Sequence, residues 1–230
     1  TTYGELNARV NRIAHLLADD MGVRPGDRVA YLLPNCPEIL EVYYAVQKIG
    51  AVAVPLNYKL IAREIGYLVN ASGAGTLVFA SQFATSVAEA SRSFSGTVAL
   101  VGVDAGRRVR RDAVACFDAP LVSLDRACEA KGSDEPELMR DPGALSRIQY
   151  TGGSTGLPKG AARTHAADLV ELDAIMDSNG IGDEPDAVVL IQCPLEHHGG
   201  HSWFSVALAA GATLVICEAF NAEQILRCID

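Results

Sequence analysis

Residues 28–57 read RVAYLLPNCPEILEVYYAVQKIGAVAVPLN, and this stretch sets the fold class. Arg28–Leu33 is mostly apolar and predicts a short buried strand, and Ala51–Pro55 predicts a second one. Between them, Pro37–Ile49 has apolar residues at helical spacing, a proline in its first turn and Gly50 directly after it. A strand, a helix and a further strand in this order predict a βαβ unit with parallel strands.

The same alternation continues on both sides of this unit. Upstream, Thr2 and Glu5 have the spacing of a capping box, which predicts a helix that reaches Leu17. The fold class we predict is therefore α/β, with mostly parallel sheets covered by helices. The other expected elements are helices over 60–70, 82–93, 166–178, 202–210 and 221–229, and strands over 76–80, 97–103, 144–150, 187–192 and 213–217.

A polar segment, Lys131–Gly143, interrupts the pattern with prolines and glycines and is the best candidate for a linker. We therefore predict a first α/β subdomain over residues 1–140 and the start of a second over 141–230. The chain begins without methionine and stops inside an amphipathic pattern. We accordingly expect the fold to be truncated at both ends, with a C-terminal remainder absent.

Composition narrows the class of protein. The 230 residues are 49% hydrophobic, with 19 Lys and Arg against 28 Asp and Glu, a net charge of −9. Such a chain folds into a globule and is a poor candidate for nucleic-acid binding. The one dense basic run, residues 106–111, lacks the aromatic residues of a nucleic-acid surface and indicates a solvated loop.

Two further patterns concern the compartment. The longest weakly polar stretch, Phe204–Cys217, is shorter than the about 20 apolar residues that a membrane span needs. The 6 cysteines include no CxxC pair, which favours free thiols in a reducing compartment. We expect a cytoplasmic protein without a transmembrane segment, and its oligomeric state cannot be predicted from the sequence.

The stretch with the clearest chemistry is residues 150–160, YTGGSTGLPKG, which follows a predicted strand. Glycines let the main chain approach a ligand, and successive N–H groups in such a loop can converge on anionic oxygens. Hydroxyl groups add donors, and a lysine adds a positive charge suited to phosphate. This loop therefore predicts polyphosphate binding by Thr151, Gly152, Gly153, Ser154, Thr155, Gly156 and Lys159.

Other interpretations of this loop are weaker. A Walker A loop would need Ser or Thr after its lysine, but Gly160 follows Lys159. Residues 152–156 also fit the G-x-S-x-G elbow of serine hydrolases, with Ser154 as nucleophile. That elbow needs a helix directly after the serine, and Pro158 opposes one. A plain surface turn is the third alternative.

Residues 150–160 resemble the signature [YF]-[TS]-[SG]-G-[ST]-T-G-x-P-K-G of the adenylate-forming, AMP-binding enzymes, which include acyl-CoA synthetases. Three further segments resemble this family: residues 2–6 (TYGEL), residues 26–35 (GDRVAYLLPN) and residues 50–57 (GAVAVPLN). The resemblance covers the whole chain but only the N-terminal portion of such an enzyme. It implies activation of a small carboxylic acid by ATP and Mg²⁺ to acyl-AMP, then transfer to coenzyme A.

The segment Pro194–Gly200 resembles the family pattern P-[LM]-[FY]-H-x-x-G. The resemblance implies that His197 borders the acyl and nucleotide sites, and that Gly200 and Trp203 are candidates for the acyl pocket. Glu196 stands where the family usually has an aromatic residue.

Three histidines fall within residues 197–201. A metal site is disfavoured, because Gly199 and Gly200 oppose a helix that would align His197 with His201. We expect His198 and His201 to be polar residues at a helix entrance. For both Trp203 and Phe204 we expect core packing, with lining of the acyl pocket as the alternative.

The family's adenine, ribose, Mg²⁺ and C-terminal lysine motifs are absent from these residues, so we expect the isolated chain to be inactive or nearly so. The Mg²⁺ ion would be held mainly by ATP and by residues outside the chain. Two alternatives stay open: a serine hydrolase using Ser154, and a non-catalytic relative that binds nucleotide or acyl ligands. The particular acid and thiol acceptor cannot be read.

Overall fold

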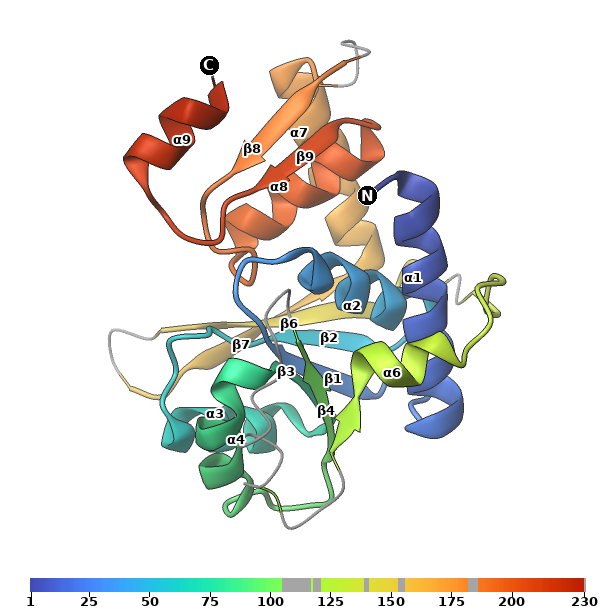
Figure 1. Ribbon diagram of the computed structural model, residues 1–230, viewed down its shortest axis with the longest axis vertical. Helices are drawn as coiled ribbons and strands as arrows, with labels where there is room; N and C mark the ends of the chain where they lie inside the picture. Colours follow the sequence, from blue (N-terminus) through green and yellow to red (C-terminus); the bar gives the residue numbers. More distant parts are fainter. Residues whose placement is uncertain (105–116, 118–120, 139–140, 153–155, 182–185, 230) are drawn as a thin grey trace.

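In the computed structural model, the βαβ unit predicted from residues 28–57 is present (Figure 1). The structure describes residues 1–230 except 105–116, 118–120, 139–140, 153–155, 182–185 and 230. Strand β1 (Arg28–Leu32) and strand β2 (Val52–Pro55) are parallel and are connected by helix α2 (Pro37–Lys48). The proline at the start of α2 needs no N–H partner there, which suits the first turn.

These strands belong to a seven-stranded sheet with the order β5-β4-β3-β1-β2-β6-β7. Strands β1 to β6 run parallel to one another, and β7 is antiparallel to β6. The sequence did not predict β5 or β7, which are short or rich in polar and small residues. The bounds are β3 Ala74–Ala80, β4 Ala99–Val103, β5 Val122–Ser123, β6 Leu145–Thr151 and β7 Lys159–Thr164.

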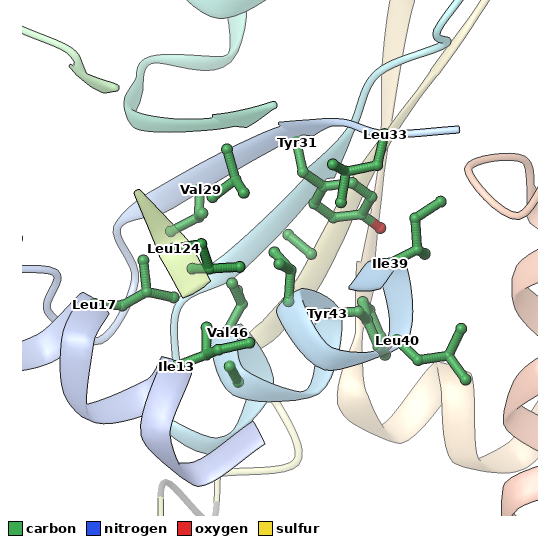
Figure 2. Packing of buried hydrophobic residues seen from close by; sticks show 14 of the residues in the cluster. Ile13, Leu17, Val29, Tyr31, Leu33, Ile39, Leu40, Tyr43, Val46 and Leu124 are labelled. Carbon is green, nitrogen blue, oxygen red and sulfur yellow. The ribbon is translucent and has the colours of Figure 1, made fainter. Parts of the chain in front are cut away.

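Helices cover both faces of this sheet (Figure 1). Alternate residues of β1 point to opposite faces: Val29 and Tyr31 pack towards α2, and Ala30 and Leu32 pack towards the other face. Figure 2 shows Ile13 among the buried side chains that pack between the sheet and α2. The covering elements are α1 (Tyr3–His15), a π-helical turn (Leu16–Asp20), α2 and α6 (Leu124–Glu129) on one face, and α3 (Ala62–Ser72), a 3-10 turn (Ser81–Phe83) and α4 (Ala84–Ser91) on the other.

A second, smaller sheet holds the parallel strands β8 (Val188–Ile191) and β9 (Thr213–Ile216). Three helices accompany it: α7 (His165–Asn179), α8 (His198–Ala209) and α9 (Ala222–Ile229). We call residues 165–230 the second region and the preceding part of the chain the first region. In Figure 1, α8 lies between the small sheet and α2.

The two regions are joined by hydrogen bonds. The Asn35 amide donates to the carbonyl oxygens of Cys193 (2.9 Å) and Cys217 (3.0 Å), and accepts from the Leu195 N–H (2.8 Å). The Tyr3 hydroxyl donates to the Ala212 carbonyl oxygen at 2.8 Å.

The predicted division at residues 140/141 remains a proposal. Strands β6 and β7 follow this point and still belong to the large sheet. None of the described helices has the length and apolar character that crossing a bilayer requires. The basic run at residues 106–111 lies outside the described residues.

Candidate functional site

A pocket of about 310 Å³ lies where strands β2 and β6 end. Its walls come from both regions. In the first region, Pro55 is the last residue of β2, Asn57 follows that strand, and Thr151 is the last residue of β6. In the second region, His197 directly precedes α8. In α/β folds, ligands bind outside the carboxyl ends of parallel strands. The position therefore agrees with a ligand site, and it connects the Gly-rich loop to the histidine segment.

The Gly-rich loop connects β6 to β7 as a hairpin. Thr151 faces Lys159 in the strand register, and the Thr151 hydroxyl donates to the Lys159 carbonyl oxygen at 3.5 Å. Thr151 and Gly152 are exposed and line the pocket. Lys159 is also exposed but does not line it. Gly153, Ser154 and Thr155 lie outside the described residues, and Gly156 is exposed with a φ of 155°.

The hairpin bears on the serine-hydrolase alternative. The residues from Lys159 form a strand antiparallel to β6, whereas the hydrolase elbow needs a helix directly after its serine. This arrangement disfavours Ser154 as a nucleophile of that type.

His197 is exposed at the pocket wall and is the N-cap residue of α8. Its main chain is held on both sides: its N–H donates to the Pro194 carbonyl oxygen (3.2 Å), and its own carbonyl accepts from the His201 N–H (2.9 Å). The ring is held separately, because its Nε2 lies 3.1 Å from Nδ2 of Asn57. Asn57 ends the segment 50–57 that resembles the family. From the sequence alone, no role was predicted for Asn57.

Glu196 and Gln149 add buried polar groups to the same pocket. The Gln149 amide donates to the Glu196 carbonyl oxygen at 2.5 Å, and neither Glu196 carboxyl oxygen has a hydrogen-bond partner. Burial raises the pKa of Glu196 to about 7. The nearby N–H groups of Glu196 and Tyr58 and the Lys59 charge lower this pKa in part. Neither N–H group forms a hydrogen bond of normal geometry with the carboxyl. The sequence showed Glu196 only as a departure from the usual aromatic residue.

The expectation for His201 is wrong: its side chain is 5% exposed and packs against Tyr43, with ring centroids 4.6 Å apart. The Arg147 guanidinium contacts it, with Nη1 2.6 Å from Nε2. Desolvation, and next the Arg147 charge, hold the pKa of His201 well below its usual range, so a neutral ring accepts from the guanidinium.

Arg147 connects the two regions from strand β6. Its side chain is 1% exposed and forms an ion pair with Asp168 of α7 at 3.2 Å. Asp168 also pairs with Arg163 at 2.6 Å. His198, at 3.1 Å from Arg147 and from Glu171, is exposed and extends this network. A charged residue in the middle of a strand, between Ser146 and Ile148, was the signal that could have identified Arg147.

Helix α8 begins at His198, four residues before the predicted start. Gly199 and Gly200 lie inside this helix, so the expectation that they oppose a helix here is wrong. Close packing accounts for the glycine at position 200. A Cβ atom on Gly200 would lie 2.2 Å from the Pro194 carbonyl oxygen and 2.8 Å from Cα of Leu195. Phe204 is fully buried as expected, whereas Trp203 is 36% exposed. Neither Gly200 nor Trp203 lines the pocket, and their role in an acyl site stays a prediction.

Metal ligands are not grouped in the part of the chain that the structure describes: no three His, Cys, Asp or Glu side chains are placed to hold an ion. The loop suits a polyphosphate, because Thr151 and Gly152 are exposed and line the pocket. A Mg²⁺ ion bound by the protein alone does not fit these residues.

Comparison with known proteins identifies the class. The family model for AMP-binding enzymes matches residues 1–230, so this chain belongs to that family. The resemblance seen in the sequence is thereby confirmed.

Curated relatives show acid–thiol ligases. The chain is 33% identical over 237 residues to a feruloyl-CoA synthase of Amycolatopsis sp, which covers 100% of this chain and 41% of the relative. It is 32% identical to the long-chain-fatty-acid–CoA ligase FadD13 of Mycobacterium tuberculosis, covering 97% and 41%. The chain therefore spans about two fifths of the length of these relatives.

Solved structures agree with the fold. The N-terminal domain of FACL13 from Mycobacterium tuberculosis matches 100% of this chain and 53% of its own, with a TM-score of 0.79 and 26% identity. ATP-bound MatB from Rhodopseudomonas palustris matches 99% and 42%, with a TM-score of 0.82 and 26% identity. The predicted fold, that of the N-terminal domain of an adenylate-forming enzyme, is confirmed.

Proposed function

We propose that the enzyme built on this chain activates a carboxylic acid with ATP and transfers the acyl group to coenzyme A. The observation that carries this proposal is the pocket in which Thr151 and Gly152 of the phosphate loop meet His197. Family membership supports the same chemistry. The isolated 230 residues are proposed to be inactive or nearly so.

The proposed reaction has two steps. In the first, a carboxylate oxygen of the acid forms a bond to the α-phosphorus of ATP, and the bond to pyrophosphate breaks. In the second, a thiolate attacks the acyl carbon, the bond to AMP breaks, and the thiol proton passes to solvent. The first step builds negative charge on the leaving pyrophosphate, so donors placed around it lower the barrier.

The residues divide this work by their positions. Thr151, the main chain from Gly152 to Gly156, and Lys159 are proposed to hold the phosphates by hydrogen bonds and charge. His197 is proposed to orient the carboxylate. ATP is the nucleotide we propose, since ATP-bound MatB has the same fold. Mg²⁺ would bring charge neutralisation when bound with the nucleotide.

The relatives guide the choice of acid. One relative is a feruloyl-CoA synthase and another is a long-chain-fatty-acid–CoA ligase, so aromatic and fatty acids head the panel. A role in fatty acid metabolism and a cytoplasmic location are proposals of the same kind. No nucleic acid is proposed as a partner.

The test is ATP–pyrophosphate exchange that depends on an added acid, run on the longest natural chain that contains residues 1–230. Lys159→Ala should lower the exchange rate by about 10²–10³, the usual effect of losing one preorganised donor. Lys131→Ala is a matched control, because Lys131 does not line the pocket. Its Nζ instead pairs with the Asp20 carboxylate at 2.6 Å. Absence of exchange with every acid would overturn the proposal and favour a non-catalytic binding relative.

A further inference from the structure

Both the oxygen and the nitrogen of the Asn57 side-chain amide have a hydrogen-bond partner. Its Oδ1 accepts the N–H of Lys59, two residues on, at 2.8 Å, which is the geometry of an Asx turn. Its main-chain carbonyl accepts the N–H of Leu60 at 3.1 Å. The amide oxygen is thereby committed to the turn, and the Nδ2 group points to the other partner.

That other partner is the imidazole of His197, whose Nε2 lies 3.1 Å from Nδ2. An amide NH₂ group only donates, so the ring nitrogen that faces it must accept. A neutral imidazole that accepts at Nε2 carries its proton on Nδ1. The turn after β2 therefore fixes which nitrogen of His197 is protonated.

The arrangement also determines what the ring offers to a ligand. The main chain of His197 is anchored at the start of α8, so rotation of the side chain is the freedom that Asn57 removes. Both residues line the pocket beside Thr151 and Gly152. With Nε2 occupied, the Nδ1–H group is the donor that remains for a bound molecule.

We propose that Asn57 is a positioning residue that holds His197 as the Nδ1–H tautomer, so that the ring donates a hydrogen bond to the bound acid or acyl phosphate. The part played in catalysis rests on the function proposed above. The tautomer itself does not, and it can be measured on the 230-residue chain.

The direct experiment is ¹⁵N NMR of the His197 ring, because protonated and unprotonated ring nitrogens have widely separated shifts. The native chain should show an unprotonated Nε2 and a protonated Nδ1. In Asn57→Asp the carboxylate keeps the Asx turn but can only accept, so the proton should move to Nε2. In Asn57→Ala the preference for Nδ1–H should be lost.

Asn70 provides a matched control on α3, away from the pocket. It has the same pattern, since its Oδ1 accepts the Ser95 N–H (2.8 Å) and its Nδ2 donates to the Ser93 carbonyl oxygen (2.8 Å). Asn70→Asp should leave the His197 nitrogen shifts unchanged. A protonated Nε2 in the native chain, or shifts unaltered by Asn57→Asp, would overturn the inference.

Activity supplies the second measurement. In the longest natural chain, Asn57→Asp should lower kcat of acid-dependent exchange by about 10- to 100-fold, as expected for a misplaced orienting group, with little change in the KM for ATP. If the native enzyme shows no exchange, the proposed function fails, while the NMR result still decides the tautomer. An unchanged kcat with an inverted tautomer would overturn the catalytic part.

Discussion

Strand β1 and helix α7 show how differently the two regions of this chain are packed. The last four residues of β1 are at most 1% exposed, and helices cover them on both faces. Helix α7 has no buried residue among its 15, and Leu169 and Val170 are 55% and 70% exposed. A two-stranded sheet offers too little apolar surface to bury the helices beside it. The second region therefore depends on the contacts that join it to the first.

Among the residues that join the two regions, we expect the buried Arg147 to have the largest effect on stability. Arg147→Ala removes a fully buried charge that pairs with Asp168 and contacts His201, and leaves those groups with fewer partners. We expect a loss of about 3–5 kcal/mol in the free energy of unfolding of the second region. Urea denaturation with hydrogen exchange of α8 and β1 amides measures it.

The control is Arg227→Ala, whose pair with Glu223 is 76% exposed on both sides and should contribute almost nothing. Equal destabilisation of β1 and α8 amides by Arg147→Ala would contradict the view that Arg147 joins two separately packed regions.

The predictability of the chain from sequence follows the same division. The periodicity of residues 28–57 predicted β1, α2 and β2 within one or two residues, because each buries an apolar face. Strand β7 was missed because its residues, KGAART, are polar or small and are exposed or half-buried. Local pattern cannot reveal a strand that is specified by pairing with β6.

The site was predictable only in part. Thr151, Gly152 and His197 were named from their motifs, and the structure brings them to one pocket. Asn57 and Glu196 come from separate segments, and only the fold shows that they lie beside His197. The helix start at His198 was missed because propensity disfavours glycine, whereas packing against Pro194 demands it at position 200.

The second prediction concerns Glu196, where the two regions meet. Its pKa is raised to about 7 by burial, and Lys59, the nearby charge, opposes the rise. Below the unfolded pKa the carboxyl is protonated in both states. As the pH rises to 7 the unfolded state releases its proton first, so stability falls with pH and the loss is complete above 7.

Glu196→Gln removes this titration. Relative to the native chain, the variant should gain up to about 3 kcal/mol of stability between pH 4 and pH 8. Chemical denaturation across that range measures the difference. The control is Glu64→Gln, since Glu64 lines the same pocket but accepts the Ile61 N–H at 3.0 Å. A native stability curve parallel to that of Glu196→Gln would contradict the prediction.

The smallest effect is expected from a single methyl group in α8. Gly200→Ala would place its Cβ atom against the Pro194 carbonyl and should cost about 1–3 kcal/mol through a forced main-chain shift. Gly199→Ala is the matched control, because no atom lies within 4 Å of its Cβ position. Thermal unfolding of the two variants separates packing from helix propensity, and equal melting temperatures would show that the close approach is unimportant.

We propose that residues from both regions form one site that responds to nucleotide. The most direct measurement is an NMR titration of the 230-residue chain with ATP, following the amides of Thr151, Gly152 and His197, with Gly180 at the end of α7 as the internal reference. We expect saturable shifts at Thr151, Gly152 and His197 together, and none at Gly180. Shifts confined to one region, or no saturable change at any of these residues, would contradict it.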